Sequence, residues 1–299
     1  MGSKKEIKEK FFRRGLKALN TFTEKQILYY YCPICARPFP KEALDNKELT
    51  LEHIPPEAQG GKGIALTCNI CNNKAGHTVD AAVTNRNLLS NLHEALSTKQ
   101  GNYEGRTKFN FAKNELESVN FDLSIKDSAL RICLVEESNR PDCSENLIEF
   151  FKKQASLPDE ERTPIPFTTR TRYHVWHSKV GDLRSAFLVC FAAFGYNYVF
   201  NETLGEVRNQ IINYDDEIID NFWWKLGPEE ESGHRLYIIN KPFNAILCQI
   251  GKVKILLPWM NSPENFYTFL SNKYSNSGHE VFEGNQISWS YCQMLCLEV

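Results

Sequence analysis

Two cysteine pairs with the same spacing are the feature that most constrains the fold of this 299-residue chain. Cys32 and Cys35 flank Pro-Ile, and Cys68 and Cys71 flank Asn-Ile. Two such turns supply four thiolates, which is the ligand set of a closed, tetrahedral structural zinc site. We therefore predict that these four cysteines bind Zn²⁺ and hold the segment between them in one conformation.

That segment carries a carboxylate next to a histidine. Glu52 and His53 follow a short alternating stretch typical of a strand, and Pro55-Pro56 ends the strand directly after them. A second strand is expected at Leu66-Thr67, and a helix from Cys71 to about Ala82, with more helix from 87 to 96. The order is strand, loop, strand, helix.

These residues resemble the HNH family of nucleases, whose catalytic unit is a ββα fold around one divalent metal ion. The resemblance covers about residues 32 to 82. It is strongest to zinc-knuckle bacterial members, in which Glu-His-Ile-Pro-Pro precedes a second knuckle that runs into Asn-Asn. It implies that His53 is the general base and that Glu52 and Asn72 bind the catalytic Mg²⁺ or Mn²⁺. The chain departs from the family at Gly63, where the family's middle asparagine is expected, so the side chain that orients the base is absent.

Two further residues of the predicted helix are candidate phosphate contacts. Lys74 and His77 follow Asn72 on the same helix, but His77 lies about 140° around the helix from Asn72 and is therefore a poor partner for the same ion. For Lys74 a solvated position, and for His77 a capping or surface position, stay open beside the phosphate contact.

The N-terminal segment is basic, although the formal net charge of the chain is −2. A helix is expected from about Lys5 to Leu19, and its basic residues are Lys4, Lys5, Lys8, Lys10, Arg13, Arg14 and Lys17. Two interpretations stay open: a solvated amphipathic helix with Phe12, Leu16 and Leu19 on its apolar face, or an arm that follows the phosphates of a nucleic acid.

The rest of the chain predicts a second, larger domain. Antiparallel strands are expected within 108–137, a helix at 144–154, a strand at 167–176, helices near 181–194 and 203–211, and a hairpin at 235–258. The fold class is α+β: a zinc-stapled ββα-metal unit followed by a mixed domain with antiparallel strands. The expected domains are a basic helical segment at 1–30, the nuclease domain at 31–98, and a domain at 99–299 for target selection, sensing or partner binding.

Composition places the chain among soluble proteins of a reducing compartment. The remaining six cysteines show no disulfide framework, and the start of the chain lacks the apolar core of a signal peptide. The longest apolar run, 185–200, is shorter than the ~20 residues of a membrane span. We expect a cytoplasmic protein without membrane contact.

The resulting functional hypothesis is a metal-dependent endonuclease that hydrolyses DNA, with RNA not excluded, in bacterial restriction or anti-phage defence. A protein partner or activator is expected to act through the C-terminal domain. Two alternatives stay open: a zinc-stabilised adaptor that binds nucleic acid or protein without cleaving it, and a nuclease subunit that is active only within a larger complex.

Overall fold

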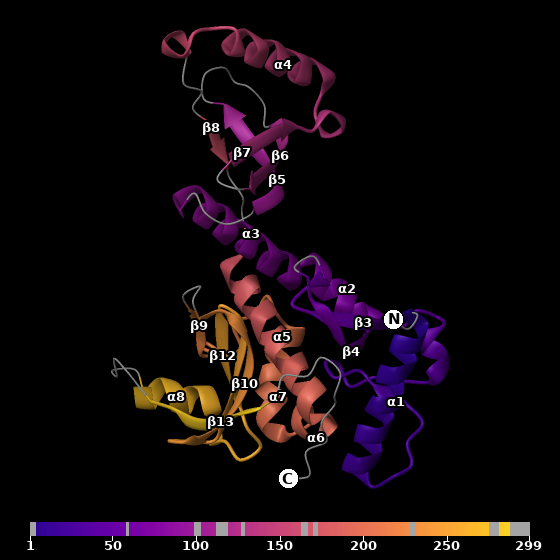
Figure 1. The fold of residues 1–299 in the computed structure, drawn as a ribbon. Helices are drawn as coiled ribbons and strands as arrows, with labels where there is room; N and C mark the ends of the chain where they lie inside the picture. The colour runs from indigo at the N-terminus through magenta and orange to yellow at the C-terminus, as the bar shows by residue number, and fades with distance from the viewer. Residues whose placement is uncertain are drawn as a thin grey trace. The chain divides into compact units, whose positions relative to one another are not determined.

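The computed structural model describes residues 4–57, 60–98, 103–111, 119–126, 129–162, 167–169, 173–227, 231–274 and 281–287 (Figure 1). The fold is mixed α+β, and its described strand pairs are antiparallel, as expected. The chain forms two compact units: Met1–Thr84 together with His174–Val299, and Asn85–Tyr173. The C-terminal segment from residue 174 thus packs in the same unit as the cysteine pairs.

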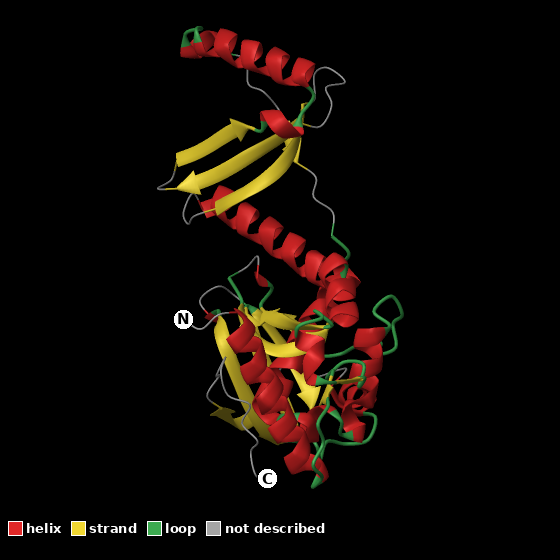
Figure 2. Cartoon of the chain, turned by 90° about the vertical axis from the view of Figure 1, so that its right-hand side faces the viewer, coloured by secondary structure: helices red, strands yellow, loops and turns green. Residues whose placement is uncertain are grey.

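The first unit contains three sheets. Its N-terminal elements are α1 (Lys4–Thr23), β1 (Tyr30–Tyr31), β2 (Pro38–Phe39), η1 (Lys41–Leu44), β3 (Leu49–Ile54), β4 (Lys62–Cys68), α2 (Asn69–His77) and the start of α3 (Val79–Thr98). Its C-terminal elements are α5 (Val175–Phe194), α6 (Tyr196–Val199), η5 (Glu202–Leu204), α7 (Gly205–Ile212), β9 (Trp224–Leu226), β10 (Gly233–Lys241), β11 (Ala245–Gly251), β12 (Val253–Pro258), α8 (Phe266–Tyr274) and β13 (Glu283–Ile287). The C-terminal strands form one sheet in the order β13-β10-β11-β12-β9 (Figure 1). Figure 2 distinguishes the helices, in red, from the strands, in yellow.

Helix α5 lies at the centre of the first unit. Its residues from Ser178 to Phe194 are nearly all buried, which requires that other elements surround the helix. Accordingly it packs against β4, β11, β12, α6 and α7, and Leu183 and Phe187 are fully buried. Two charged residues of this helix, Asp182 and Arg184, are also buried.

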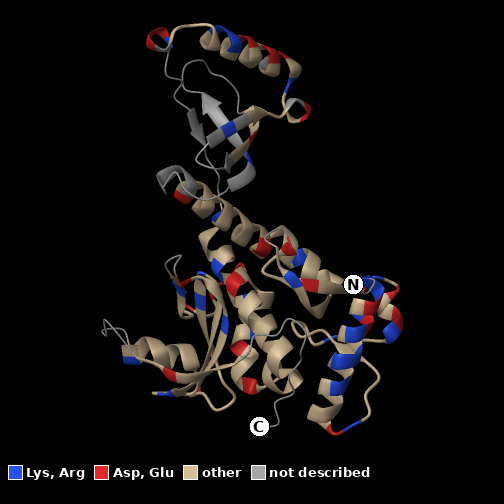
Figure 3. Cartoon of the chain, in the orientation of Figure 1, with Lys and Arg blue, Asp and Glu red and all other residues tan. Residues whose placement is uncertain are grey.

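Helix α1 is amphipathic. Its buried residues include Phe11, Phe12 and Leu19, and its basic residues lie along the rest of the helix, interrupted by Glu6 and Glu9 (Figure 3). The apolar face packs toward β1, β4 and α6. This confirms the amphipathic helix expected from the sequence, while phosphate binding by its basic residues stays a prediction.

The second unit has its own sheet and core. Its strands β5 (Tyr103–Phe111), β6 (Val119–Lys126), β7 (Ala129–Leu134) and β8 (Phe167–Thr169) pair in the order β7-β6-β5-β8. Its other elements are the remainder of α3, the short helices η3 (Glu136–Ser138) and η4 (Asp159–Glu161), and α4 (Pro141–Ala155). A small cluster that includes Phe121, Leu123 and Leu147 forms the core.

The structure corrects two expectations for the second half of the chain. Of the strand expected at 167–176, Phe167–Thr169 is a strand, residues 170–172 lie outside the described residues, and Trp176 lies in helix α5 instead. The side chain of His174 caps that helix by accepting a hydrogen bond from the backbone N–H of His177, and the burial of α5 outweighs the alternating local pattern. The hairpin expected at 235–258 is a meander of three strands, β10 to β12.

No helix among the described residues combines the length and apolar character needed to cross a membrane. The cysteines whose side chains are described are free thiols.

Candidate functional site

The four predicted zinc ligands meet at one point. Cys32 directly follows β1, Cys68 ends β4 and caps α2, and Cys71 lies in the first turn of that helix. The four Sγ atoms lie within 4.8 Å of one another, and those of Cys35 and Cys68 are 3.7 Å apart. A tetrahedral zinc site with Zn–S bonds of about 2.3 Å has sulfur–sulfur edges of roughly 3.8 Å. The cluster therefore fits a metal ion of this kind.

Hydrogen-bond donors face three of the four sulfur atoms. The Arg37 guanidinium donates to Cys35 Sγ through Nε and to Cys68 Sγ through Nη2, both at 3.3 Å, and the backbone N–H of Cys68 donates to Cys32 Sγ. These contacts raise the pKa of Arg37 above its ordinary value. Such outer contacts orient metal ligands and balance their charge. Sequence reasoning did not identify Arg37, although a cation two residues after a CxxC turn is the signal that could have done so.

Tyr30 connects the first cysteine pair to the hairpin. Its ring is fully buried, and its hydroxyl donates to the backbone oxygen of Leu66 at 2.7 Å. Gly15 of α1 lies against this ring so closely that a Cβ atom there would be 2.3 Å from Tyr30 Cε2. Helix α1 thus supports the segment that leads into Cys32.

The β3–β4 hairpin carries two of the predicted catalytic residues, Glu52 and His53, at neighbouring positions of β3. Glu52 pairs with Ala65 and His53 with Gly63, so the register shifts by one residue between them. A bulge of this kind increases the local twist and redirects side chains. A side chain at Gly63, where the family has its middle asparagine, would require the Leu51 side chain to move, because a Cβ atom there would lie 2.5 Å from Leu51 Cδ2. Gly61 is more strictly constrained, since its Cβ would lie 1.5 Å from the Pro55 backbone oxygen, which is part of the main chain.

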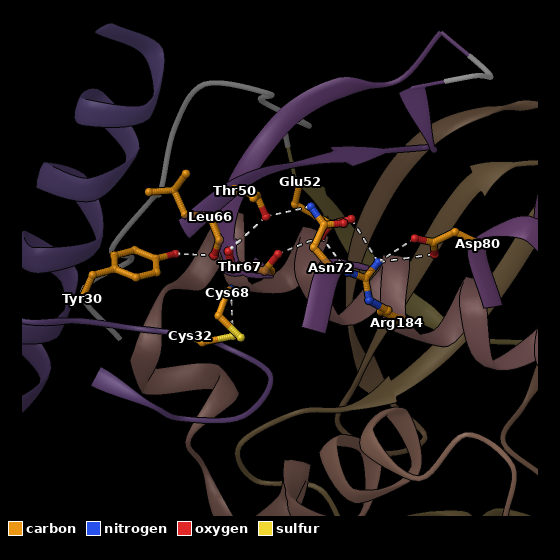
Figure 4. Close-up of polar contacts among 10 residues, drawn as sticks. All are labelled: Tyr30, Cys32, Thr50, Glu52, Leu66, Thr67, Cys68, Asn72, Asp80 and Arg184. Carbon is orange, nitrogen blue, oxygen red and sulfur yellow. Dashed lines mark hydrogen bonds and ion pairs between the residues drawn. The ribbon is translucent and has the colours of Figure 1, made fainter. Parts of the chain in front are cut away.

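Glu52 and Asn72 belong to one hydrogen-bonded network (Figure 4). Thr67 Oγ1 donates to Glu52 Oε2 at 3.0 Å, and Asn72 Nδ2 donates to Thr50 Oγ1 at 2.8 Å. Thr50 in turn donates to the Thr67 backbone oxygen at 3.3 Å. Because its nitrogen is engaged, the Asn72 amide presents its oxygen as the remaining group for a cation.

The carboxylate of Glu52 also forms a buried ion pair with Arg184 of α5. Arg184 Nη1 donates to Oε1 at 3.0 Å and Nη2 to Oε2 at 2.6 Å, while the side chains of Arg184 and Glu52 are 2% and 4% exposed. Asp80, near the start of α3, lies on the other side of the guanidinium, with Oδ2 at 3.3 Å from Nη1. Figure 4 shows the two carboxylates pointing toward the same guanidinium.

Electrostatics in this triad are dominated by burial and by the shared cation. Burial opposes the charge of Arg184, but Glu52 and Asp80 outweigh it and raise the pKa of the guanidinium. Burial raises the pKa of Asp80; Arg184 opposes this shift, and the negative charge of Glu52 adds to it. Sequence reasoning missed Arg184. Its signal was a lone cation beside a long apolar stretch, where a buried charge needs a partner.

Among the described residues, His53, Lys74 and His77 form no hydrogen bond with this network. The His53 side chain is half-buried, and within the described part of the chain its ring forms no hydrogen bond. Lys74 donates to the Ile212 backbone oxygen at 3.2 Å and its ammonium lies 4.7 Å from the centre of the Tyr214 ring. His77, the last residue of α2, is exposed. Lys74 therefore contacts the protein here, whereas His53 and His77 are open to solvent.

Residues 32–88 match the sequence model of a family described as HNH endonuclease. This range includes both cysteine pairs, the β3–β4 hairpin and helix α2. Comparisons with curated proteins and with solved structures gave no match.

Proposed function

Because residues 32–88 belong to the HNH endonuclease family, we propose that this chain is a metal-dependent endonuclease that hydrolyses DNA phosphodiester bonds. The observation that supports the proposal is the hydrogen-bonded network that joins Glu52, the residue before His53 in β3, to Asn72, the residue after Cys71 in α2. It supplies a carboxylate and an amide oxygen, which are hard donors of the kind that Mg²⁺ and Mn²⁺ prefer.

In the proposed reaction His53 acts as the general base. An imidazole accepts protons readily near neutral pH, and the half-buried ring of His53 is open to a water molecule. His53 would remove a proton from that water, whose oxygen attacks the phosphorus as the bond to the 3′ oxygen breaks. A divalent cation held by Glu52 and Asn72 would stabilise negative charge on the phosphate and the departing oxygen. The products are 5′-phosphate and 3′-hydroxyl ends.

The cysteine cluster has a structural role in this proposal. Cys68 caps α2, and Asn72 directly follows Cys71, so a Zn²⁺ ion bound by the four thiolates would fix the start of the helix that carries Asn72. Removing the ion is then expected to abolish catalysis indirectly, by releasing Asn72 from the hairpin.

Cleavage of supercoiled plasmid tests the activity. Wild-type protein is expected to nick or linearise the plasmid with Mg²⁺ or Mn²⁺ and to be inactive with EDTA. His53→Ala is expected to lower the rate by about 10²–10⁴-fold, the usual contribution of a general base. His234→Ala is the matched control, because it removes an exposed imidazole of the same unit that lies on β10, outside the proposed site. Cleavage that persists at the wild-type rate in His53→Ala would rule out the assigned base.

The two compact units suggest how the remaining tasks are divided. Residues 174–299 pack with the hairpin and contribute Arg184, so we assign them to the nuclease core. Target selection, ligand sensing or binding of a protein activator is assigned to Asn85–Tyr173, which has its own sheet and core. Deleting that unit should change substrate preference or activation while leaving the first unit folded, and loss of zinc binding in the deletion variant would contradict this division.

DNA is the proposed substrate because the mechanism requires no 2′-hydroxyl, and the same assay with a single-stranded RNA decides whether RNA is also cut. We place the activity in restriction or anti-phage defence. Bacteria that express the wild-type protein should then reduce phage plating, and the His53→Ala variant should not. Equal plating in the two strains would exclude a defence role that depends on cleavage.

A binding role without cleavage is the second candidate, and Gly63 favours it. The hairpin lacks the asparagine that would orient the base, and the Leu51 side chain lies where the Cβ atom of such a residue would be. An adaptor of this type would bind DNA equally well in wild-type and His53→Ala forms and would cleave in neither. A subunit that needs a partner would instead gain activity when purified together with the products of neighbouring genes.

A further inference from the structure

We propose that Arg184 is a positioning residue of the candidate nuclease site, acting through Glu52, so that the site extends beyond residues 32–88 to helix α5. The inference rests on the proposed function, because it concerns how Glu52 is presented to a divalent cation. It adds to the site a residue that the matched segment does not contain.

The guanidinium is held in a fixed place. Arg184 lies in the middle of α5, its side chain is 2% exposed, and its neighbour Leu183 is fully buried. A side chain enclosed at this density has little freedom to change rotamer. Two parallel hydrogen bonds from Nη1 and Nη2 therefore fix the plane of the Glu52 carboxylate relative to the helix.

The hydrogen bonds to Glu52 determine which of its oxygen atoms can bind a cation. An ionised carboxylate offers about four acceptor sites, two on each oxygen. Arg184 Nη2 and Thr67 Oγ1 use both sites on Oε2, and Arg184 Nη1 uses one on Oε1. Among the described contacts, a single acceptor site on Oε1 is left. Arg184 and Thr67 thus leave one lone pair, on Glu52 Oε1, available to bind a cation.

Asp80 provides a second contact that holds the Arg184 guanidinium in place. Arg184 Nη1 donates to Glu52 Oε1 at 3.0 Å and also approaches Asp80 Oδ1 and Oδ2 at 3.4 and 3.3 Å. The guanidinium of Arg184 is therefore held by a carboxylate of β3 and by a carboxylate of α3. Two carboxylates that share one guanidinium leave the triad net negative, which favours a further cation nearby.

Lysine cannot replace this arginine in the proposed role. A guanidinium is a planar fork that matches a carboxylate with two parallel bonds, whereas an ammonium is a point charge on a flexible chain. Arg184→Lys therefore keeps the buried positive charge but loses the fixed orientation of Glu52. This substitution separates positioning from charge balance.

The test measures Mn²⁺ affinity of the zinc-loaded full chain by electron paramagnetic resonance, in which the signal of free Mn²⁺ falls as the ion binds. Arg184→Lys is expected to weaken Mn²⁺ binding by about 10- to 100-fold, the usual effect of removing an outer contact of a metal ligand. The control Arg208→Lys changes a half-buried arginine of α7 that bonds to the Val199 backbone oxygen, and it should bind Mn²⁺ as the wild type does. Thermal unfolding of each variant checks that the fold is retained.

A double-mutant cycle shows whether Arg184 acts through Glu52. Glu52→Gln should weaken Mn²⁺ binding by itself, and adding Arg184→Lys should cause no further loss, because the oriented carboxylate is already gone. Independent, additive losses would overturn the inference. If Arg184→Lys does not fold, Asp80→Asn replaces it, since it frees the guanidinium from one anchor. Weaker Mn²⁺ binding is expected from that variant, and wild-type affinity would count against the inference.

Plasmid cleavage by the same preparations separates this inference from the proposed function. If the wild type binds Mn²⁺ and cleaves, and Arg184→Lys matches it in both, the inference alone fails. Tighter Mn²⁺ binding by Arg184→Lys also overturns it, because the guanidinium would then compete with the cation. A wild type that neither binds Mn²⁺ nor cleaves overturns the proposed function, and the inference with it.

Discussion

Because Gly15 packs against Tyr30, we predict that Gly15→Ala destabilises the protein, although helix propensity alone predicts that it stabilises it. In a helix, alanine is more favourable than glycine by about 1 kcal/mol, so Gly15→Ala in α1 would stabilise an isolated helix. Here the new Cβ would lie 2.3 Å from Tyr30 Cε2 and 2.6 Å from Cδ2, so the ring must move. The ring is completely buried, and its hydroxyl donates to the Leu66 backbone oxygen at 2.7 Å.

Overpacking of a buried site costs about 1–3 kcal/mol. Loss of a buried hydrogen bond costs a further ~1–3 kcal/mol. After the ~1 kcal/mol gained from helix propensity, Gly15→Ala is expected to destabilise the protein by about 1–5 kcal/mol. The matched control is Gly76→Ala in α2, where a Cβ meets nothing within 4 Å. That change is expected to stabilise by up to about 1 kcal/mol.

The assay is urea unfolding of the zinc-loaded protein, monitored by far-ultraviolet circular dichroism. The free energies of unfolding are compared between variants whose m-values are the same. The same substitution in a Tyr30→Leu variant tests whether the cost arises from the Tyr30 ring. The aromatic ring is absent there, so adding Gly15→Ala should no longer destabilise the protein. If Gly15→Ala stabilises the wild-type protein as much as Gly76→Ala does, the close contact between α1 and Tyr30 is wrong. Equal destabilisation in the Tyr30→Leu background would show that the cost arises elsewhere.

Three further outcomes follow from burial and metal binding. Elemental analysis should find about one zinc per chain, and Cys68→Ser should lower this value and expose the other ligand thiols to an alkylating reagent; full zinc retention would contradict the four-thiolate site. Arg184→Met leaves the buried Glu52 carboxylate without its partner and should cost about 3–5 kcal/mol in chemical unfolding, so a cost near zero would argue against the buried pair. Burial raises the pKa of Cys190, so this thiol stays protonated at pH 8 and should resist iodoacetamide until the protein unfolds. Rapid labelling of the native protein at Cys190, located by mass spectrometry, would contradict its burial.

Local signals in the sequence led to the hairpin and the helix after it. Pro55 and Pro56 follow β3, which ends at Ile54, and the CxxC spacing predicts the meeting of four sulfur atoms regardless of the rest of the fold. The alternating pattern at 167–176 led to the wrong prediction of a strand at Trp176, because a short polar-apolar alternation also fits the capped start of a helix. In that case the decisive factor was the burial of α5 among β4, β11 and β12, which are distant in sequence.

The sequence by itself determined the four-cysteine cluster, the strand–strand–helix order around Glu52, His53 and Asn72, and the mixed α+β class, since spacing and periodicity are local properties of the chain. Only the tertiary structure decided that Arg184, 132 positions from Glu52 along the chain, pairs with its carboxylate. It also decided that Gly63 lies against the side chain of Leu51. The physical reason is that the partner of a buried charge, and the space around a packed residue, depend on residues that only the folded chain brings together.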